Sequence, residues 1–243
     1  MRLTACVVVT CGVTLIAASQ PEPIAQRIVR RTMTLNLPLG PCEVPNVVLF
    51  LARDVQLPAG AEFLPVSCAA VYSDKNRPPI TDRIPLTGMR LGEAIELLNK
   101  TDPRYHTKES DGVIVVRPLE AWINDKHFLH NTIEKLELTE ENIGGALEEI
   151  VAPFWRNRRG RSMAATMSGF GKITISIGPV AVVEALDAIV RTHGAAQWEI
   201  SYCGVIPEVA ADLATVFLHT YDDHRIGAPV APRRQVNGRS IVC

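Results

Sequence analysis

Hydrophobic and polar residues alternate along this chain in two patterns, one with the period of a β-strand and one with that of an amphipathic helix. Every second residue of Met33–Leu37 is apolar, as expected of a strand with one buried face. In Leu91–Asn99, the apolar residues lie on one face of a helix. These patterns predict strands at 33–37, 83–86, 105–108, 113–116, 133–138, 172–177 and 198–202. They predict helices at 44–55, 91–99, 140–151 and 179–190, with Thr139 as a cap of the third.

The clearest local prediction is a β-hairpin around residues 109–112. The dipeptide Asp111-Gly112 lies between two strand-like runs, Tyr105–Lys108 and Val113–Val116. Asp-Gly favours the left-handed backbone that a two-residue hairpin turn needs. We therefore expect these two runs to pair antiparallel.

The order of the elements predicts an α+β fold with two tandem lobes. The lobes cover residues 33–118 and 128–203, and each has two helices packed on short sheets. The polar stretch 68–83 has the composition of an exposed loop, and we interpret it as an insertion in the first lobe. Residues 204–243 show little periodicity and are predicted to form a C-terminal tail.

The first residues resemble a leader for export. Met1-Arg2 precedes an uncharged apolar run from Leu3 to Ala18, and the chain turns polar at Ser19. This predicts a signal peptide over residues 1–19, cut near Ser19, and a periplasmic or secreted product. An uncleaved anchor is the alternative, although the run is shorter than the roughly 20 residues that comfortably span a bilayer. Lipidation of Cys6 or Cys11 is a further alternative.

The nearly balanced charge of the chain argues against some classes of binding partner. The chain has 25 basic and 26 acidic residues, so it lacks the strongly positive balance of a general nucleic-acid-binding protein. No segment after the leader is apolar for long enough to span a membrane. We expect a protein partner, recognised by local shape.

Four cysteines follow the leader: Cys42, Cys68, Cys203 and Cys243. An even number suits disulfides in an oxidising compartment, and four cysteines allow three pairings. We favour Cys42–Cys68 and Cys203–Cys243, because each pair stays within one segment, and buried free thiols are the alternative. The cysteines lack C-x-x-C spacing, which disfavours zinc.

The strongest candidate for a metal site is the run from His219 to His224, where His219, Asp222, Asp223 and His224 offer suitable ligand types. Two histidines five residues apart do not share a helix face, and on a strand they point to opposite sides. We therefore favour an exposed turn and keep a metal-dependent hydrolase as an alternative function. We find no nucleophile motif, no phosphate-binding loop and no cofactor motif, so we predict no catalytic residue and no cofactor.

A basic cluster follows Trp155 and contains Arg156, Arg158, Arg159 and Arg161. Guanidinium groups suit carboxylate and phosphate, so the cluster is a candidate site for an anion or a partner. The alternative is a solvated basic loop with Trp155 packed against the core.

These patterns resemble the secretin and TonB short N-terminal domain, STN, a small periplasmic module. The resemblance covers roughly residues 33–118, with a weaker echo at 133–202, and it rests on Met33–Pro38, Val47–Leu57, Ile84–Leu98 and Asp111–Pro118. It implies helices packed on small sheets, and a role in docking partners or passing signals without chemistry. The stretch 68–83 departs from that pattern. We therefore predict an exported binding module, with a structural component of the envelope as a further alternative.

Overall fold

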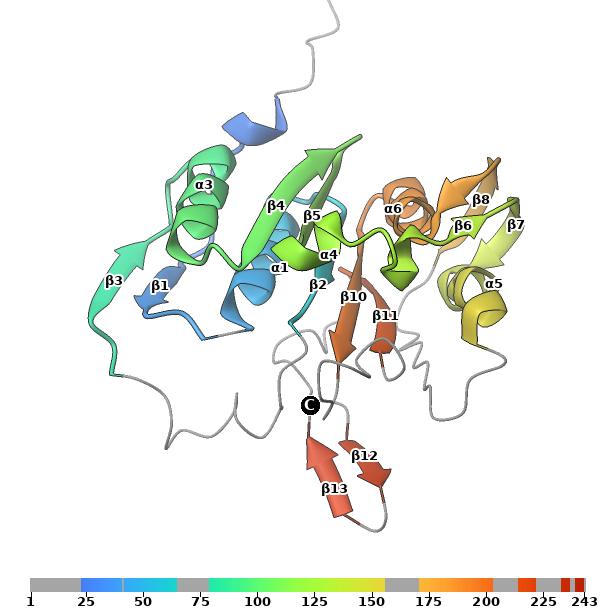
Figure 1. Cartoon of the computed structure of the whole chain (residues 1–243). Coiled ribbons are helices and arrows are strands. Elements are labelled where there is room, and N and C mark those ends of the chain that lie inside the picture. Colours follow the sequence, from blue (N-terminus) through green and yellow to red (C-terminus); the bar gives the residue numbers. More distant parts are fainter. Residues whose placement is uncertain are drawn as a thin grey trace, which may run out of the picture.

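The computed structural model describes residues 23–40, 42–64, 79–155, 171–202, 214–221, 233–236 and 239–242. Within these residues the predicted α+β class is confirmed (Figure 1). The helices are α1 (Glu43–Asp54), α3 (Leu91–Thr101), α4 (Leu119–Ile123), α5 (Ile143–Trp155) and α6 (Val182–His193), with 3-10 turns η1 (Ile24–Gln26) and η3 (Phe128–His130). The strands are β1 (Thr34–Leu37), β2 (Ala59–Glu62), β3 (Asp82–Pro85), β4 (Tyr105–Ser110), β5 (Val113–Pro118), β6 (Thr132–Ile133), β7 (Leu136–Asn142), β8 (Lys172–Ile177), β9 (Val180–Ala181), β10 (Ala196–Tyr202), β11 (Ala214–Thr220), β12 (Arg233–Val236) and β13 (Arg239–Val242).

The centre of the molecule is a five-stranded sheet with the order β11-β10-β2-β5-β4. Strands β10, β2 and β5 are parallel, and β11 and β4 pair antiparallel at the two edges. Three of these strands come from the first half of the chain, and two come from the second half. The two halves therefore share one sheet, where the sequence predicted separate sheets for two tandem lobes.

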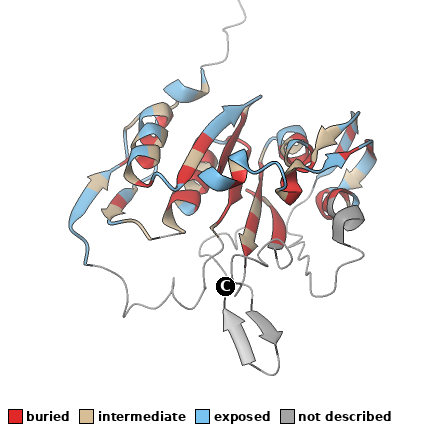
Figure 2. Cartoon of the chain, viewed as in Figure 1, coloured by how far each residue is buried: buried red, intermediate tan, exposed pale blue. Residues whose placement is uncertain are grey.

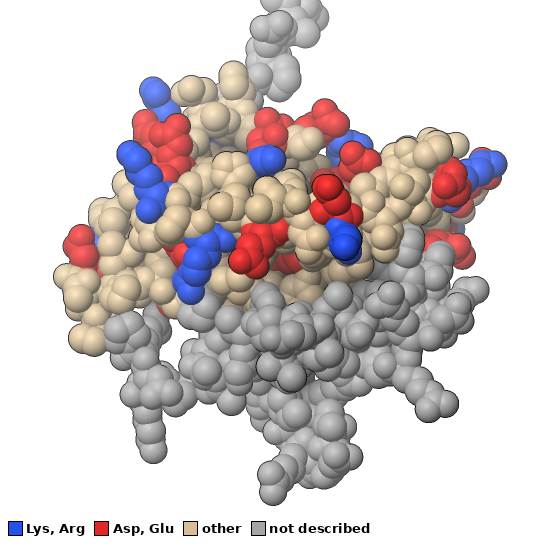
Figure 3. Space-filling view, viewed as in Figure 1, with Lys and Arg blue, Asp and Glu red and all other residues tan. Residues whose placement is uncertain are grey.

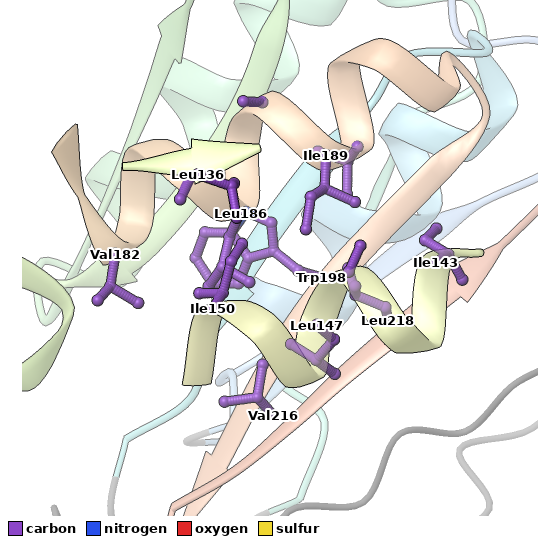
Figure 4. Packing of buried hydrophobic residues seen from close by; sticks show 14 of the residues in the cluster. Leu136, Ile143, Leu147, Ile150, Val182, Leu186, Ile189, Trp198, Val216 and Leu218 are labelled. Carbon is purple, nitrogen blue, oxygen red and sulfur yellow. The ribbon is translucent and has the colours of Figure 1, made fainter. Parts of the chain in front are cut away.

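Each face of the central sheet is covered by two helices from one half of the chain. Ala61 and Val116 belong to a core with α1 and α3, whereas Val115, Trp198 and Ile200 belong to a core with α5 and α6. Figure 4 shows the second core, with Trp198 at its centre. Figure 2 shows the central strands as mostly buried. The predicted pair of helices in each half is thus present.

Two small sheets lie outside the helices. The β1–β3 pair packs on α1 and α3 through Leu35 and Ile84, and the β7–β8 pair packs on α5 and α6 through Leu138 and Ile175. Figure 1 shows these sheets at opposite ends of the molecule. The layers therefore run from small sheet to helices, central sheet, helices and second small sheet.

The predicted hairpin is confirmed at atomic detail. Asp111 and Gly112 both have positive φ, 49° and 84°, and they join β4 to β5. Gly194 ends α6 in the same left-handed region, with a φ of 81°. Both turns use residues that adopt this backbone at low cost.

The central strand β2 was not predicted. Its sequence, Ala-Gly-Ala-Glu, has little of the β-branched character that marks strands. The reason for the glycine is tertiary, because a Cβ on Gly60 would lie 2.0 Å from the Trp198 ring. The indole of β10 thus occupies the space that a larger side chain in β2 would fill.

Two helix starts differ from the prediction. Thr139 lies within β7, and α5 begins at Ile143, where the Asn142 side chain accepts a hydrogen bond from the Gly145 N–H. The helix expected from Pro179 begins at Val182, after the short strand β9. In both places a strand continues into residues whose pattern also fits a helix: Glu141 and Asn142 pair with β8 after a bulge, and Val180 and Ala181 pair with β6.

The prediction of a tail from residue 204 is wrong for Ala214–Thr220. This segment forms the edge strand β11, which pairs with β10 along its whole length. Residues 68–78 of the expected insertion and the expected leader, residues 1–19, lie outside the described residues, and the expected strand near residue 83 is β3. None of the described helices is both long and apolar enough to cross a membrane.

Candidate functional site

A cluster of buried polar side chains lies at the carboxyl ends of the three parallel strands. Glu62 ends β2, Arg117 is near the end of β5, and Tyr202 ends β10. Gly60 is level with Val115, and Glu62 is level with Ile200. Glu62, Arg117 and Tyr202 lie two residues beyond Gly60, Val115 and Ile200, so the three side chains are on one face of the sheet. The carboxyl edge of parallel strands is where α/β folds commonly place functional groups.

Glu62 is the centre of this cluster. Its side chain is 1% exposed, and its Oε2 lies 2.7 Å from Nε of the fully buried Arg117. Its Oε1 lies 2.8 Å from His127 Nε2 and accepts a hydrogen bond from the Tyr202 hydroxyl. Both carboxylate oxygens are therefore paired, as a buried charge requires.

Arg117 connects the sheet to the segment that links the two halves, residues 119–131, which we call the connector. Its Nη2 donates to the Ala121 carbonyl at 2.9 Å, near the end of α4. Its Nη1 lies 3.2 Å from His130 Nε2. Lys108 Nζ and Arg117 Cζ lie 4.3 Å and 4.9 Å from the centroid of the Trp122 ring, and Trp122 Nε1 donates to the His106 carbonyl. The connector is thus held in place by contacts with Arg117, a charged side chain that is itself buried in the core.

The two ring nitrogens of His127 have different neighbours. Its Nδ1 faces two donors, the Leu129 N–H at 3.3 Å and Arg117 Nη2 at 3.3 Å, so Nδ1 must act as the acceptor. The ring proton is therefore on Nε2, which donates toward Glu62. His130 Nε2 likewise accepts from Arg117.

The cluster shifts two pKa values. Burial by itself raises the pKa of Glu62, but hydrogen bonds from His127 and Tyr202 and the charge of Arg117 together lower it below its usual value. Burial and the nearby Arg117 lower the pKa of His130. Glu62 is therefore ionised and His130 is neutral at pH 7.

These pairings restrict the chemistry of the cluster. A general base needs an accepting nitrogen or oxygen directed at a substrate. Both His127 nitrogens and both Glu62 oxygens are directed at groups of the protein itself. The arrangement is suited to holding the connector in place.

The connector carries exposed apolar side chains on its outer side. Leu119 is 47% exposed and Ile123 is 73% exposed, and they are four residues apart on α4. Residues at this spacing lie on the same helix face. Figure 3 shows acidic and basic side chains interspersed on the visible face, without a continuous basic stripe.

The structure describes only one residue of the predicted metal candidate. His219 lies on β11, stacked on Phe217, with its Nε2 3.8 Å from Glu199 Oε1. Asp222, Asp223 and His224 lie outside the described residues. Among the residues that are described, no three His, Cys, Asp or Glu side chains gather closely enough to hold a metal ion.

The other predicted site residues are mostly not described. Arg156, Arg158, Arg159 and Arg161 lie outside the described residues, and for Trp155 only its place at the end of α5 is described. Cys42 precedes α1. Cys68, Cys203 and Cys243 lie outside, so the described part of the chain contains no disulfide and both pairings stay predictions.

The cluster itself was missed by sequence reasoning, although weak signals were present. Arg117 follows four apolar residues of a strand, and Glu62 sits among small and apolar residues. A single charge within an apolar run points to a buried pair. The identity of its partner cannot be read locally, since Glu62 and Arg117 are 55 positions apart.

No protein-family model, no curated protein and no solved structure matches this chain. The STN resemblance therefore stays a prediction, and the function has to be argued from the residues and their geometry.

Proposed function

We propose that this chain is an exported protein-binding module without catalytic activity, and that α4 is part of its binding surface. One contrast carries the proposal: the buried polar groups are used to hold the connector, whereas the apolar side chains of Leu119 and Ile123 are left exposed on it. Apolar side chains grouped on a surface are typical of contacts with other proteins.

The rigidity of α4 favours binding. The helix has only five residues, too few to be stable alone. It is held by Arg117 at the Ala121 carbonyl and by Trp122 at the His106 carbonyl. A preformed surface loses less conformational entropy when a partner binds.

Export is proposed from the sequence. The uncharged apolar run before Ser19 fits a signal peptide, and four later cysteines fit an oxidising compartment. The pairs of helices packed on small sheets are compatible with an STN-like module. A hydrolase at His219 has less support, because that side chain is half-buried beside Glu199. A structural envelope role has no specific observation in its favour.

The test is site-specific photo-crosslinking in the periplasm. A photoreactive residue replaces Ile123, and a matched control replaces Glu96, which is exposed on α3. We expect a discrete crosslinked partner at position 123 that is absent at position 96 and is lost when Leu119→Glu is added. The proposal fails if both positions give the same products, or if the chain with its leader stays in the cytoplasm.

A further inference from the structure

A short strand at one end of the molecule, β1, has one edge that pairs with no other strand of the described residues. The β1–β3 pair is two-stranded, and β1 hydrogen-bonds β3 through its odd-numbered residues: the Met33 carbonyl accepts from Leu86 N–H, and the Leu37 carbonyl accepts from Thr81 N–H. Strand geometry then directs the N–H and C=O of Thr34 and Asn36 away from β3.

These outward groups have no hydrogen-bond partner among the described residues. The edge of the central sheet behaves differently. At β4, the Tyr105 N–H is bonded to the Asp102 carbonyl and the Thr107 N–H to the Asn99 side chain. Among the described residues, the chain thus covers part of the β4 edge, whereas the edge of β1 that faces away from β3 has no strand or side chain bonded to it.

A hollow of about 130 Å³ lies directly beside the open edge of β1. It is lined by Thr34, Leu35, Asn36, Leu39, Glu43, Asn46 and Val47. Its volume is below the range of roughly 300 to 1,000 Å³ that small-molecule sites occupy, and it suits a single side chain. Glu43 is the one charged residue in this lining, and one of its carboxylate oxygens accepts a hydrogen bond from the Gly40 N–H at 2.8 Å. Its negative charge favours a segment with a basic residue.

We propose that β1 receives an extended, basic segment of a partner protein, which adds as a third strand to the β1–β3 sheet. The backbone of Thr34 and Asn36 offers two N–H donors and two C=O acceptors, which is the pattern an added strand needs. One apolar side chain of that segment enters the hollow, and a lysine or arginine lies near Glu43. The inference rests on the proposed binding function and names the chemistry of its partner.

The test uses a capped hexapeptide of alternating valine and lysine, titrated into the isotope-labelled full chain by NMR. Two further peptides carry N-methyl groups, one on the three valines and the other on the three lysines. An added strand directs only one alternate set of its N–H groups at β1. We expect one methylated peptide to bind at least about tenfold more weakly than the unmodified peptide, and the other to bind about as well.

A variant of the protein provides the second arm. Asn36→Pro removes an outward N–H and leaves the bonds to β3 intact, whereas Asn36→Ala removes only the side chain. We expect the proline variant alone to lose about tenfold in affinity, with both variants unfolding at the same temperature. Equal affinities for the two methylated peptides, or shifts confined to residues outside β1 and α1, overturn the inference. If Ile123 still crosslinks a partner in that case, the binding function stands and only its strand-addition mode is excluded.

Discussion

The absence of a side chain at Gly60 allows Trp198 to lie flat on the central sheet. Trp198 is fully buried, and its Nε1 donates to Asp187 of α6 at 2.7 Å. Gly60 thus leaves the space that the Trp198 ring occupies, and in this position the ring can donate to Asp187.

Gly60→Ala is therefore expected to be strongly destabilising. The new Cβ would lie within 2.4 Å of three atoms of the indole, which has no room to move. Overpacking typically costs about 1 to 3 kcal/mol in the free energy of unfolding, and contacts this short place Gly60→Ala at the upper end of that range. The matched control is Gly178→Ala, because nothing lies within 4 Å of its added Cβ. Urea unfolding measures both variants, and equal midpoints would contradict this account.

At the scale of elements, the connector depends on the protonation of its neighbours. The pKa values of His130 and Glu62 are lowered, so the folded chain binds fewer protons than the unfolded chain. Their contribution to the free energy of unfolding is fully present above the ordinary pKa values of these groups, 6.5 for His130 and 4.5 for Glu62. It is lost as the pH falls through the lowered pKa values of the folded chain. Asp187, on α6 near Arg117, has the opposite sign: burial raises its pKa to about 6, so its contribution is lost as the pH rises.

We expect the connector to open as the pH falls below about 6.5, since a proton on His130 would face the buried charge of Arg117. Hydrogen exchange of residues 119–131, corrected for the intrinsic rate, should show faster opening at pH 5.5 than at pH 7.5. All variants carry Asp187→Asn, because this change removes the titration of Asp187, whose effect on stability has the opposite sign. His130→Gln should flatten the profile, and His193→Gln, outside the connector, should not. Coincident profiles for the His130 variant and its parent would exclude this mechanism.

For the whole molecule, the shared sheet couples the two halves. β2 of the first half lies between β5 and β10, and Trp198 of the second half packs on Gly60 of the first. Unfolding either half would expose one face of the same sheet.

We therefore expect one cooperative unfolding transition for the full chain. Hydrogen exchange in urea should give α1 and α6 a common midpoint, and far-UV circular dichroism should coincide with it. In the Gly60→Ala variant, the urea midpoints of α1 and α6 should fall by the same amount. A change confined to one of them would indicate a local effect. Two separate midpoints would indicate independent lobes.

The periodicity of the sequence by itself determined the α+β class, the hairpin at Asp111-Gly112 and the approximate positions of α1, α3, α5 and α6. These features depend on contacts between residues close in sequence and on the burial of one face of each element. Both produce a regular spacing of apolar residues along the chain. Only the tertiary structure decided that β2 and β11 join the central sheet, and that Glu62 meets Arg117, His127 and Tyr202. Position 60 of β2 is a glycine because the Trp198 ring occupies the space of a side chain there, and buried charges find partners far away in sequence, so neither feature leaves a local pattern.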